Sequence, residues 1–211
     1  MPVFRQDSAS IPGWCELRHF ELVELGAHEA MAVDRREPRE IVVSVQGTGQ
    51  FAHAMGSCAL AEGQFSAVPE SAESYTMRAA DRPAAFMRLC GRWGAEIGGC
   101  GVFRVNPGDG AKNVGDPVSY RKLTGVDSHY HDYDEYWIVL EGAGVARVGD
   151  REFVVRRGDC VATGMGHHHD IPIIHSPFKA VYLETTLGRQ KRIGHLWNHT
   201  HGNAVPDPAR A

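Results

Sequence analysis

An ungapped internal repeat constrains the fold of this chain more than any other feature of its sequence. When the sequence is shifted by 95 residues, the run IVVSV overlays YWIVL and several landmark residues coincide. The coinciding pairs include Glu40 and Glu135, Gly47 and Gly142, Gly49 and Gly144, and Gly63 and Gly158. Turn glycines adopt φ values that other residues avoid, so matched glycines indicate matched turns. The repeat predicts two domains of similar plan, with a boundary near residues 101–106.

Short apolar segments recur along both halves of the chain. They alternate with polar residues or run for about four to eight positions, and Gly, Pro, Asp or Asn separate them. Examples are FELVEL, EIVVSVQG, YWIVLEG and EFVVRRG. This spacing is typical of the strands of all-β sandwiches and barrels. We expect helices only as short segments near residues 8–16 and 187–198.

Composition narrows the classes of partner and compartment. Of 211 residues, 43% are hydrophobic and 23% charged, and a net charge of −4 argues against a general nucleic-acid binder. No apolar run approaches the ~20 residues of a membrane span, and the polar, proline-broken N-terminus does not resemble a signal peptide. The five cysteines are scattered without a Cys-x-x-Cys pair, which favours free, mostly buried thiols in a reducing compartment. We therefore expect a cytoplasmic protein without a nucleic-acid or membrane partner.

The segment HYHDYDE, which begins at His129, concentrates residue types that bind metals. Residues two apart in a strand point to the same face, so His129 and His131 should converge. The intervening DYD predicts a turn, after which Glu135 opens the next strand toward the same interior. His169 would join them from a third strand, which follows a turn at residues 164–166.

Three imidazoles and one carboxylate suit a divalent transition metal. We expect one such ion, with Fe favoured and Mn, Ni, Zn or Cu as alternatives, because Mg and Ca prefer oxygen ligands. Four protein ligands on an octahedral ion would leave two positions for water, substrate or dioxygen. In the first half, Asp34, Arg36 and Ser74 replace the three histidines, and only Glu40 is retained. That half is therefore expected to keep the fold without the metal.

These residues also carry a resemblance to the cupin superfamily. Its first motif matches H-Y-H-DYD-E-YWIVLE-G, which ends at Gly142, and its second matches G-DCVAT-G-M-G-HH-H, which ends at His169. The second motif departs from the family at Gly164, where proline is usual, and at Ile173, where asparagine is usual. The family spacing also favours His169 over His167, which shares its strand parity.

The resemblance implies a fold and a domain plan. It implies an all-β chain of two tandem conical antiparallel β-barrels, each a double-stranded β-helix or jelly roll, as in a two-domain cupin (bicupin). Residues 1–104 would form a degenerate barrel without metal ligands, residues 105–190 the metal-binding barrel, and residues 191–211 a C-terminal tail. Because cupins commonly pair through their sheets, we also expect a homodimer.

Three further residues are candidates for the chemistry around the metal. Trp137 shares parity with Glu135 and should line the substrate pocket. Tyr133, in the turn between ligands, is a candidate catalytic hydrogen-bond donor or proton carrier, with a tyrosine at the barrel rim as the alternative. Arg121 could anchor an anionic or carbonyl group of the substrate, although a solvated strand face also explains its place in YRK.

The tail segment GHLWNHTHG contains three histidines, His195, His199 and His201. A second metal site is one interpretation, but no Cys or carboxylate accompanies these histidines in the segment. The interpretation that we prefer is a segment that covers a barrel, anchored by Trp197.

The expected function is that of a metal-dependent enzyme acting on a small polar organic molecule. The metal would act as a Lewis acid or dioxygen carrier, with dioxygenase chemistry favoured and isomerase or lyase chemistry close behind. A fold alone does not settle function. Two alternatives therefore remain: a non-catalytic protein that senses a small ligand, and a structural bicupin whose metal stiffens the barrel.

Overall fold

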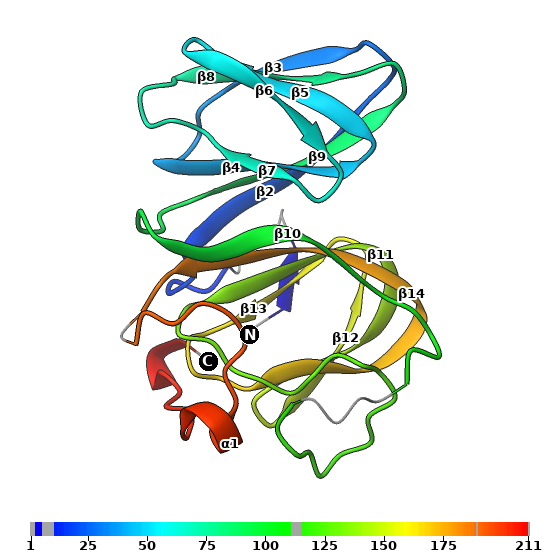
Figure 1. The fold of residues 1–211 in the computed structure, drawn as a ribbon, viewed down its shortest axis with the longest axis vertical. Coiled ribbons are helices and arrows are strands. Elements are labelled where there is room, and N and C mark those ends of the chain that lie inside the picture. The colour runs from blue at the N-terminus through cyan, green and yellow to red at the C-terminus, as the bar shows by residue number, and fades with distance from the viewer. Residues whose placement is uncertain (1–2, 6–10, 111–114, 189, 211) are drawn as a thin grey trace. The chain divides into compact units, whose positions relative to one another are not determined.

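The computed structural model describes residues 3–5, 11–110, 115–188 and 190–210, and β-strands make up nearly all of its regular structure (Figure 1). The strands are β1 (Val3–Arg5), β2 (Leu17–Leu25), β3 (Ala30–Asp34), β4 (Arg39–Gln46), β5 (Thr48–His53), β6 (Gly56–Ala61), β7 (Phe65–Ala67), β8 (Ser74–Ala79), β9 (Ala84–Gly91), β10 (Ile97–Val105), β11 (Glu135–Val148), β12 (Arg151–Arg156), β13 (Asp159–Thr163) and β14 (His169–Thr186). The helical segments described are α1 (Asn198–His201) and a 3₁₀ turn (Pro208–Arg210). The prediction of an all-β chain is confirmed.

The chain divides into two compact units that are not simple halves. Unit 1 comprises residues 1–15, 94–99 and 103–211, and unit 2 comprises residues 16–93 and 100–102. Strand β1 pairs with β13, with Phe4 opposite Cys160. The prediction that residues 1–104 form one barrel was therefore wrong for this first strand. The sequence could not reveal the pairing, because strands so far apart in the chain leave no local pattern. The domain limits at 104 and 190 stay predictions.

Unit 2 consists of two four-stranded sheets, with the orders β2-β9-β4-β7 and β3-β8-β5-β6. Every residue of β9 is buried, which suits its central position and its nearly continuous apolar sequence AAFMRLCG. Val42 and Phe86 from the first sheet share one core with Phe51 and Met77 from the second. The two sheets therefore pack face to face around a single hydrophobic core.

Unit 1 is built on a six-stranded sheet in the order β1-β13-β11-β14-β10, with β12 also paired to β11. The first part of β11 pairs with β13 and the second part with β12. Between them lies Gly142, with φ +80°, where the register with β14 shifts. Trp137 and Ala146, from the two parts of β11, belong to the same core. The sheet thus folds over itself around that core, as a jelly roll does.

The strands follow the 95-residue repeat. Under that shift β6 falls on β12 along its whole length. The start of β8 falls on the start of β14, and the end of β9 falls on the end of β14. Gly47, with φ +71°, separates β4 from β5 just as Gly142 bends β11. Two long strands of unit 1 therefore correspond to two pairs of shorter strands in unit 2. That unit 2 is a complete second cupin barrel stays a prediction.

A buried ion pair occupies the interior of unit 2 around Glu40, the counterpart of Glu135. The Glu40 carboxylate accepts hydrogen bonds from the Tyr75 hydroxyl at 2.6 Å, from Arg88 Nε and Nη2 at 3.2 Å and from the backbone amide of Glu37 at 3.1 Å. Burial would raise the pKa of Glu40, but these hydrogen bonds and the Arg88 charge hold it below its usual value. In the described part of unit 2, no three His, Cys, Asp or Glu side chains converge as a metal site.

The two predicted helices differ from the structure. Residues 190–197 are not helical, and α1 begins only at Asn198. The reason is that the Leu196 backbone pairs with Tyr130 in both directions, at 3.0 Å. Of the other predicted helix, residues 8–10 lie outside the described residues, and residues 11–16 are not helical but contain a turn, in which the Cys15 amide donates to the Pro12 carbonyl at 3.1 Å.

The five cysteines are free thiols, and all except Cys58 are buried, as predicted. Among the helices that the structure describes, none is long and apolar enough to cross a membrane.

Candidate metal centre

Backbone pairing brings the four predicted ligands to one place in unit 1. His129 and His169 exchange two backbone hydrogen bonds, at 3.3 and 2.9 Å, across an antiparallel bridge. The His131 carbonyl accepts a hydrogen bond from the Gly166 amide at 2.9 Å, which ties the first histidine segment to the turn before His169. Glu135 is the first residue of β11. Short connections and the pairing of these backbone segments therefore hold the four residues close together.

The ligand atoms of His129, His131, Glu135 and His169 all lie within 4.8 Å of one another. His129 Nε2 is 3.1 Å from His131 Nε2, and Glu135 Oε2 is 2.7 Å from His169 Nε2 and 3.2 Å from His131 Nε2. The four residues are at most 5% exposed. The structure thus forms a compact, buried His₃Glu cluster from the residues that the sequence predicts.

The opposite nitrogen of each imidazole faces a backbone carbonyl. The acceptors are the carbonyl oxygens of Asp127, Gly194 and His167, which receive Nδ1–H from His129, His131 and His169 at 3.0, 3.2 and 3.0 Å respectively. A carbonyl only accepts, so each Nδ1 must carry the proton. Each neutral ring then directs a proton-free Nε2 lone pair at the cluster, which is the tautomer that a metal requires.

Electrostatics favours the same protonation states. Burial is the main cause that lowers the pKa of both His129 and His131, so both rings are neutral at physiological pH. The neutral His129 and His131 rings therefore face the Glu135 carboxyl group and the His169 ring in one cluster.

Such an arrangement fits a metal ion, because only a cation satisfies four converging lone pairs with no proton among them. The mixed nitrogen and oxygen donor set suits a transition metal rather than Mg or Ca. His129 belongs to a second convergent group with Asp127 and His195, which lies against the first. The cluster could therefore bind a metal ion.

A cavity of about 400 Å³ opens beside the cluster. Its wall includes His129 and Glu135 together with Asp127, His195 and Glu184. The rest of the lining is Phe103, Arg104, Val105, Val126, Trp137, Tyr182 and Gly194. Burial and the Glu135 charge raise the pKa of Glu184 to about 7. A small organic molecule in this cavity would touch two of the four candidate ligands.

The other predicted site residues occupy different places. Trp137 lines this cavity, and its contact with a substrate stays a prediction. Tyr133 is 1% exposed and does not line it; its ring stacks on His131 at 4.6 Å, and its hydroxyl accepts a hydrogen bond from the Gly194 amide at 3.1 Å. Arg121 is exposed and does not line it either. His167 Nε2 faces the Asp207 carbonyl at 3.1 Å, outside the cluster.

The C-terminal segment contributes residues that the sequence analysis did not place at the site. The His195 ring stacks on His129 with centroids 3.6 Å apart and planes 4° apart. Asp127 Oδ2 accepts hydrogen bonds from His195 Nδ1 at 3.0 Å and Trp197 Nε1 at 2.7 Å. GHLWNHTHG was the available signal, but which histidine reaches the cluster depends on long-range pairing. His199 instead hydrogen-bonds Asp116 at 2.7 Å.

The end of the chain also explains the glycine that departs from the second motif. A Cβ atom at Gly164 would lie 2.1 Å from the Arg210 carbonyl oxygen, far inside contact distance. At Gly166, φ is +77°, and a Cβ atom would lie 2.3 Å from the Val205 carbonyl oxygen. Both glycines thus let the tail approach the turn that precedes His169.

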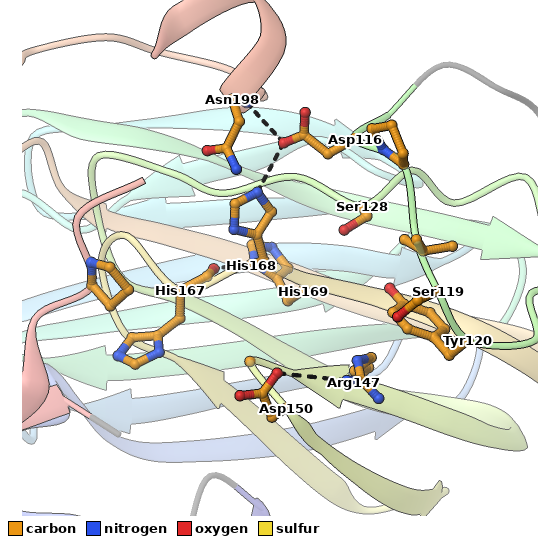
Figure 2. A pocket seen from close by; sticks show the side chains of 14 residues that line it. Asp116, Ser119, Tyr120, Ser128, Arg147, Asp150, His167, His168, His169 and Asn198 are labelled. Carbon is orange, nitrogen blue, oxygen red and sulfur yellow. Dashed lines mark hydrogen bonds and ion pairs between the residues drawn. The ribbon is translucent and has the colours of Figure 1, made fainter. Parts of the chain in front are cut away.

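A second cavity of about 340 Å³ lies beside residues 167–169 (Figure 2). Its charged side chains are largely satisfied by one another. Asp116 accepts hydrogen bonds from His168 Nε2 and the Asn198 amide, both at 2.8 Å, and Arg147 pairs with Asp150 at 3.8 Å (Figure 2). The Arg147 guanidinium also lies 4.1 Å from the centre of the Tyr120 ring. These contacts describe a polar surface that holds the tail through Asn198.

Comparisons with known proteins agree with the fold and the cluster. Residues 119–185 match the family model described as "Cupin domain". The chain is 45% identical over 210 residues to the uncharacterized protein y4oW of Sinorhizobium fredii (strain NBRC 101917 / NGR234). This match covers all of this chain and 96% of that protein. The chain belongs to the cupin superfamily. The matched segment includes the four residues of the cluster but ends before Gly194 and His195.

Solved cupin structures share the fold at very low sequence identity. The E162A mutant of Bacillus subtilis oxalate decarboxylase OxdC superimposes with a TM-score of 0.56 at 10% identity, over 83% of this cupin and 70% of that chain. Vicilin from Corylus avellana (hazelnut) superimposes with a TM-score of 0.55 at 8% identity, over 79% of this cupin and 74% of vicilin. AerE from Microcystis aeruginosa superimposes with a TM-score of 0.53 at 9% identity, over 79% of this cupin and 86% of AerE. At such identities these likenesses support the fold alone.

Proposed function

We propose that this cupin is a metal-dependent enzyme that acts on a small polar organic molecule bound in the 400 Å³ cavity beside the cluster. The observation that carries the proposal is the convergence of four buried acceptor atoms, with each imidazole oriented by a backbone carbonyl. His129, His131, Glu135 and His169 would hold the ion.

A transition metal at this site would supply Lewis-acid polarisation or a binding position for dioxygen. We favour dioxygenase chemistry on iron, with isomerase or lyase chemistry next. The chain's own groups would do the rest. Trp137 and Val126 would exclude water from the bound molecule, and Asp127 would hold His195 at the cavity wall. Ligand orientation by backbone carbonyls would keep the centre rigid.

The first test is elemental analysis of protein purified without added metal, beside the variants His129→Ala and His169→Ala. His175→Ala is a matched control, because His175 is exposed on the same strand as His169. We expect about one transition-metal ion per chain, lost in the two ligand variants and kept in the control.

The metal then directs the activity assay. Iron would lead to measurements of oxygen consumption with small organic acids and catechol-like compounds, whereas zinc, manganese or nickel would lead to isomerase, lyase and decarboxylase assays. If the protein contains no metal and its stability does not respond to added ions, the enzyme proposal is wrong and a ligand-binding cupin remains.

A further inference from the structure

The walls of the 400 Å³ cavity contain a group of aromatic side chains from three strands. Phe103 lies on β10, Trp137 on β11 and Tyr182 on β14. Trp137 and Tyr182 are register partners on adjacent strands, so their side chains share one face of the sheet. The Phe103 and Trp137 rings meet edge to face, with centroids 5.7 Å apart and planes at 62°. Ring faces and edges therefore bound one side of the cavity.

This aromatic side adjoins the candidate metal centre. The Trp137 ring centroid is 5.2 Å from that of His169, and the cavity reaches His129 and Glu135 directly. A molecule that approached the centre with an oxygen atom would therefore place its carbon skeleton against Trp137. Flat carbon rings pack well against aromatic side chains, because offset and edge-to-face contacts add to the hydrophobic effect.

The charges on the wall disfavour a small anion with two carboxylates. Asp127, Glu135 and Glu184 contribute three carboxyl groups, and the main basic groups are Arg104 and His195. Asp127 already engages His195 at 3.0 Å, so that histidine is not a free cation for a ligand. Away from the ion, the second carboxylate of a dianion would face the carboxyl groups of Asp127 and Glu184 with only Arg104 as a counter-charge, whereas an uncharged ring meets no such repulsion.

We propose that the cavity takes a small aromatic molecule, uncharged when free, that bears one or two adjacent ring hydroxyls, as phenols and catechols do. Its ring would lie against Phe103, Trp137 and Tyr182, and its oxygen atoms would face the cluster. The proposal rests on the proposed function for the direction in which the oxygens point. The affinity for the ring follows from the cavity wall.

Binding to zinc-loaded protein tests the proposal without redox chemistry. Isothermal titration would compare catechol with cis-1,2-cyclohexanediol, which has two adjacent hydroxyls but no aromatic ring, and with oxalate. We expect catechol to bind at least about tenfold more tightly than either. Phe103→Leu and Trp137→Leu should each weaken catechol binding by about tenfold and leave the zinc content unchanged.

Phe153→Leu is the matched control, because Phe153 packs on the same core but does not line the cavity. It should bind catechol like the parent protein. If zinc binds and catechol is no tighter than the diol or oxalate, or if neither wall variant weakens it, the substrate class is wrong while the proposed function stands. If zinc does not bind, the proposed function is wrong, and with it the direction of the oxygens.

Discussion

Neutralising Glu40 tests whether the buried ion pair with Arg88 stabilises unit 2. Glu40 is the counterpart of Glu135, which belongs to the histidine cluster of unit 1. The Glu40 side chain is fully buried, and that of its partner Arg88 is only 7% exposed. In Glu40→Gln, one carboxylate oxygen becomes an amide NH₂ group, which donates hydrogen bonds and cannot accept them from Tyr75 or Arg88, and the arginine charge stays buried. Breaking a buried pair from one side costs about 3–5 kcal/mol.

The assay is urea unfolding of the whole chain, followed by circular dichroism. With a slope of about 2 kcal/mol per M, the expected loss lowers the midpoint of the unit 2 transition by roughly 2 M. Glu37→Gln is the control, because its partner Arg92 is 65% exposed, and exposed pairs contribute about 1 kcal/mol or less. Replacing both partners, as Glu40→Gln with Arg88→Met, should restore much of the loss, since the one charge that then loses Arg88, on Glu21, is 34% exposed.

The effect should also depend on pH in one direction. The pKa of Glu40 is lower in the folded protein than its usual value, so its charge stabilises unit 2 above about pH 4.3, the unfolded value. That contribution disappears as the pH falls through the folded pKa. The deficit of Glu40→Gln should therefore shrink on acidification from about pH 7 to pH 3. A deficit below about 1 kcal/mol at pH 7, or one that does not change with pH, would refute the reasoning.

Three further predictions concern unit 1. Ending the chain at Gly188 removes the Gly194 carbonyl, which orients the His131 imidazole. This truncation should weaken metal binding about 10–100-fold in chelator competition, and an unchanged affinity would contradict that role. Gly164→Ala should cost about 1–3 kcal/mol in urea unfolding, but almost nothing in a chain lacking Arg210, because the clash is with that residue's carbonyl; equal losses in both chains would contradict it. Asp170→Asn should cost about 3–5 kcal/mol in the same assay, because the buried Lys122 ammonium lies 3.0 Å from that carboxylate; a loss below about 1 kcal/mol would count against the pairing.

The strands and the ligand cluster were predictable because their signals are local. His129, His131 and Glu135 lie close together in the sequence, separated by a single predicted turn, and the turn that precedes His169 contains glycine. The 95-residue repeat likewise depends on glycines whose φ angles the structure confirms at Gly47 and Gly142. In each case a short stretch of sequence fixes the backbone that positions the residue.

The features that sequence could not supply arise from distant pairing. Gly194 and His195 reach the cluster only because Leu196 pairs with Tyr130, and that pairing replaces the helix predicted for this segment. Asp127 takes its role from His195 and Trp197, which follow it by about 70 residues. No period or motif in a single sequence specifies such partners.

The pairing of β1 with β13 has a consequence for the order in which the chain can fold during synthesis. Residues 16–93 of unit 2 are contiguous, so this unit can be nearly complete while unit 1 has only its first strand. Val3 must then wait for Val161, which at about 5–20 residues per second means a delay of roughly 8–30 s. Over that interval the edge of this strand stays unpaired, which exposes it to incorrect partners.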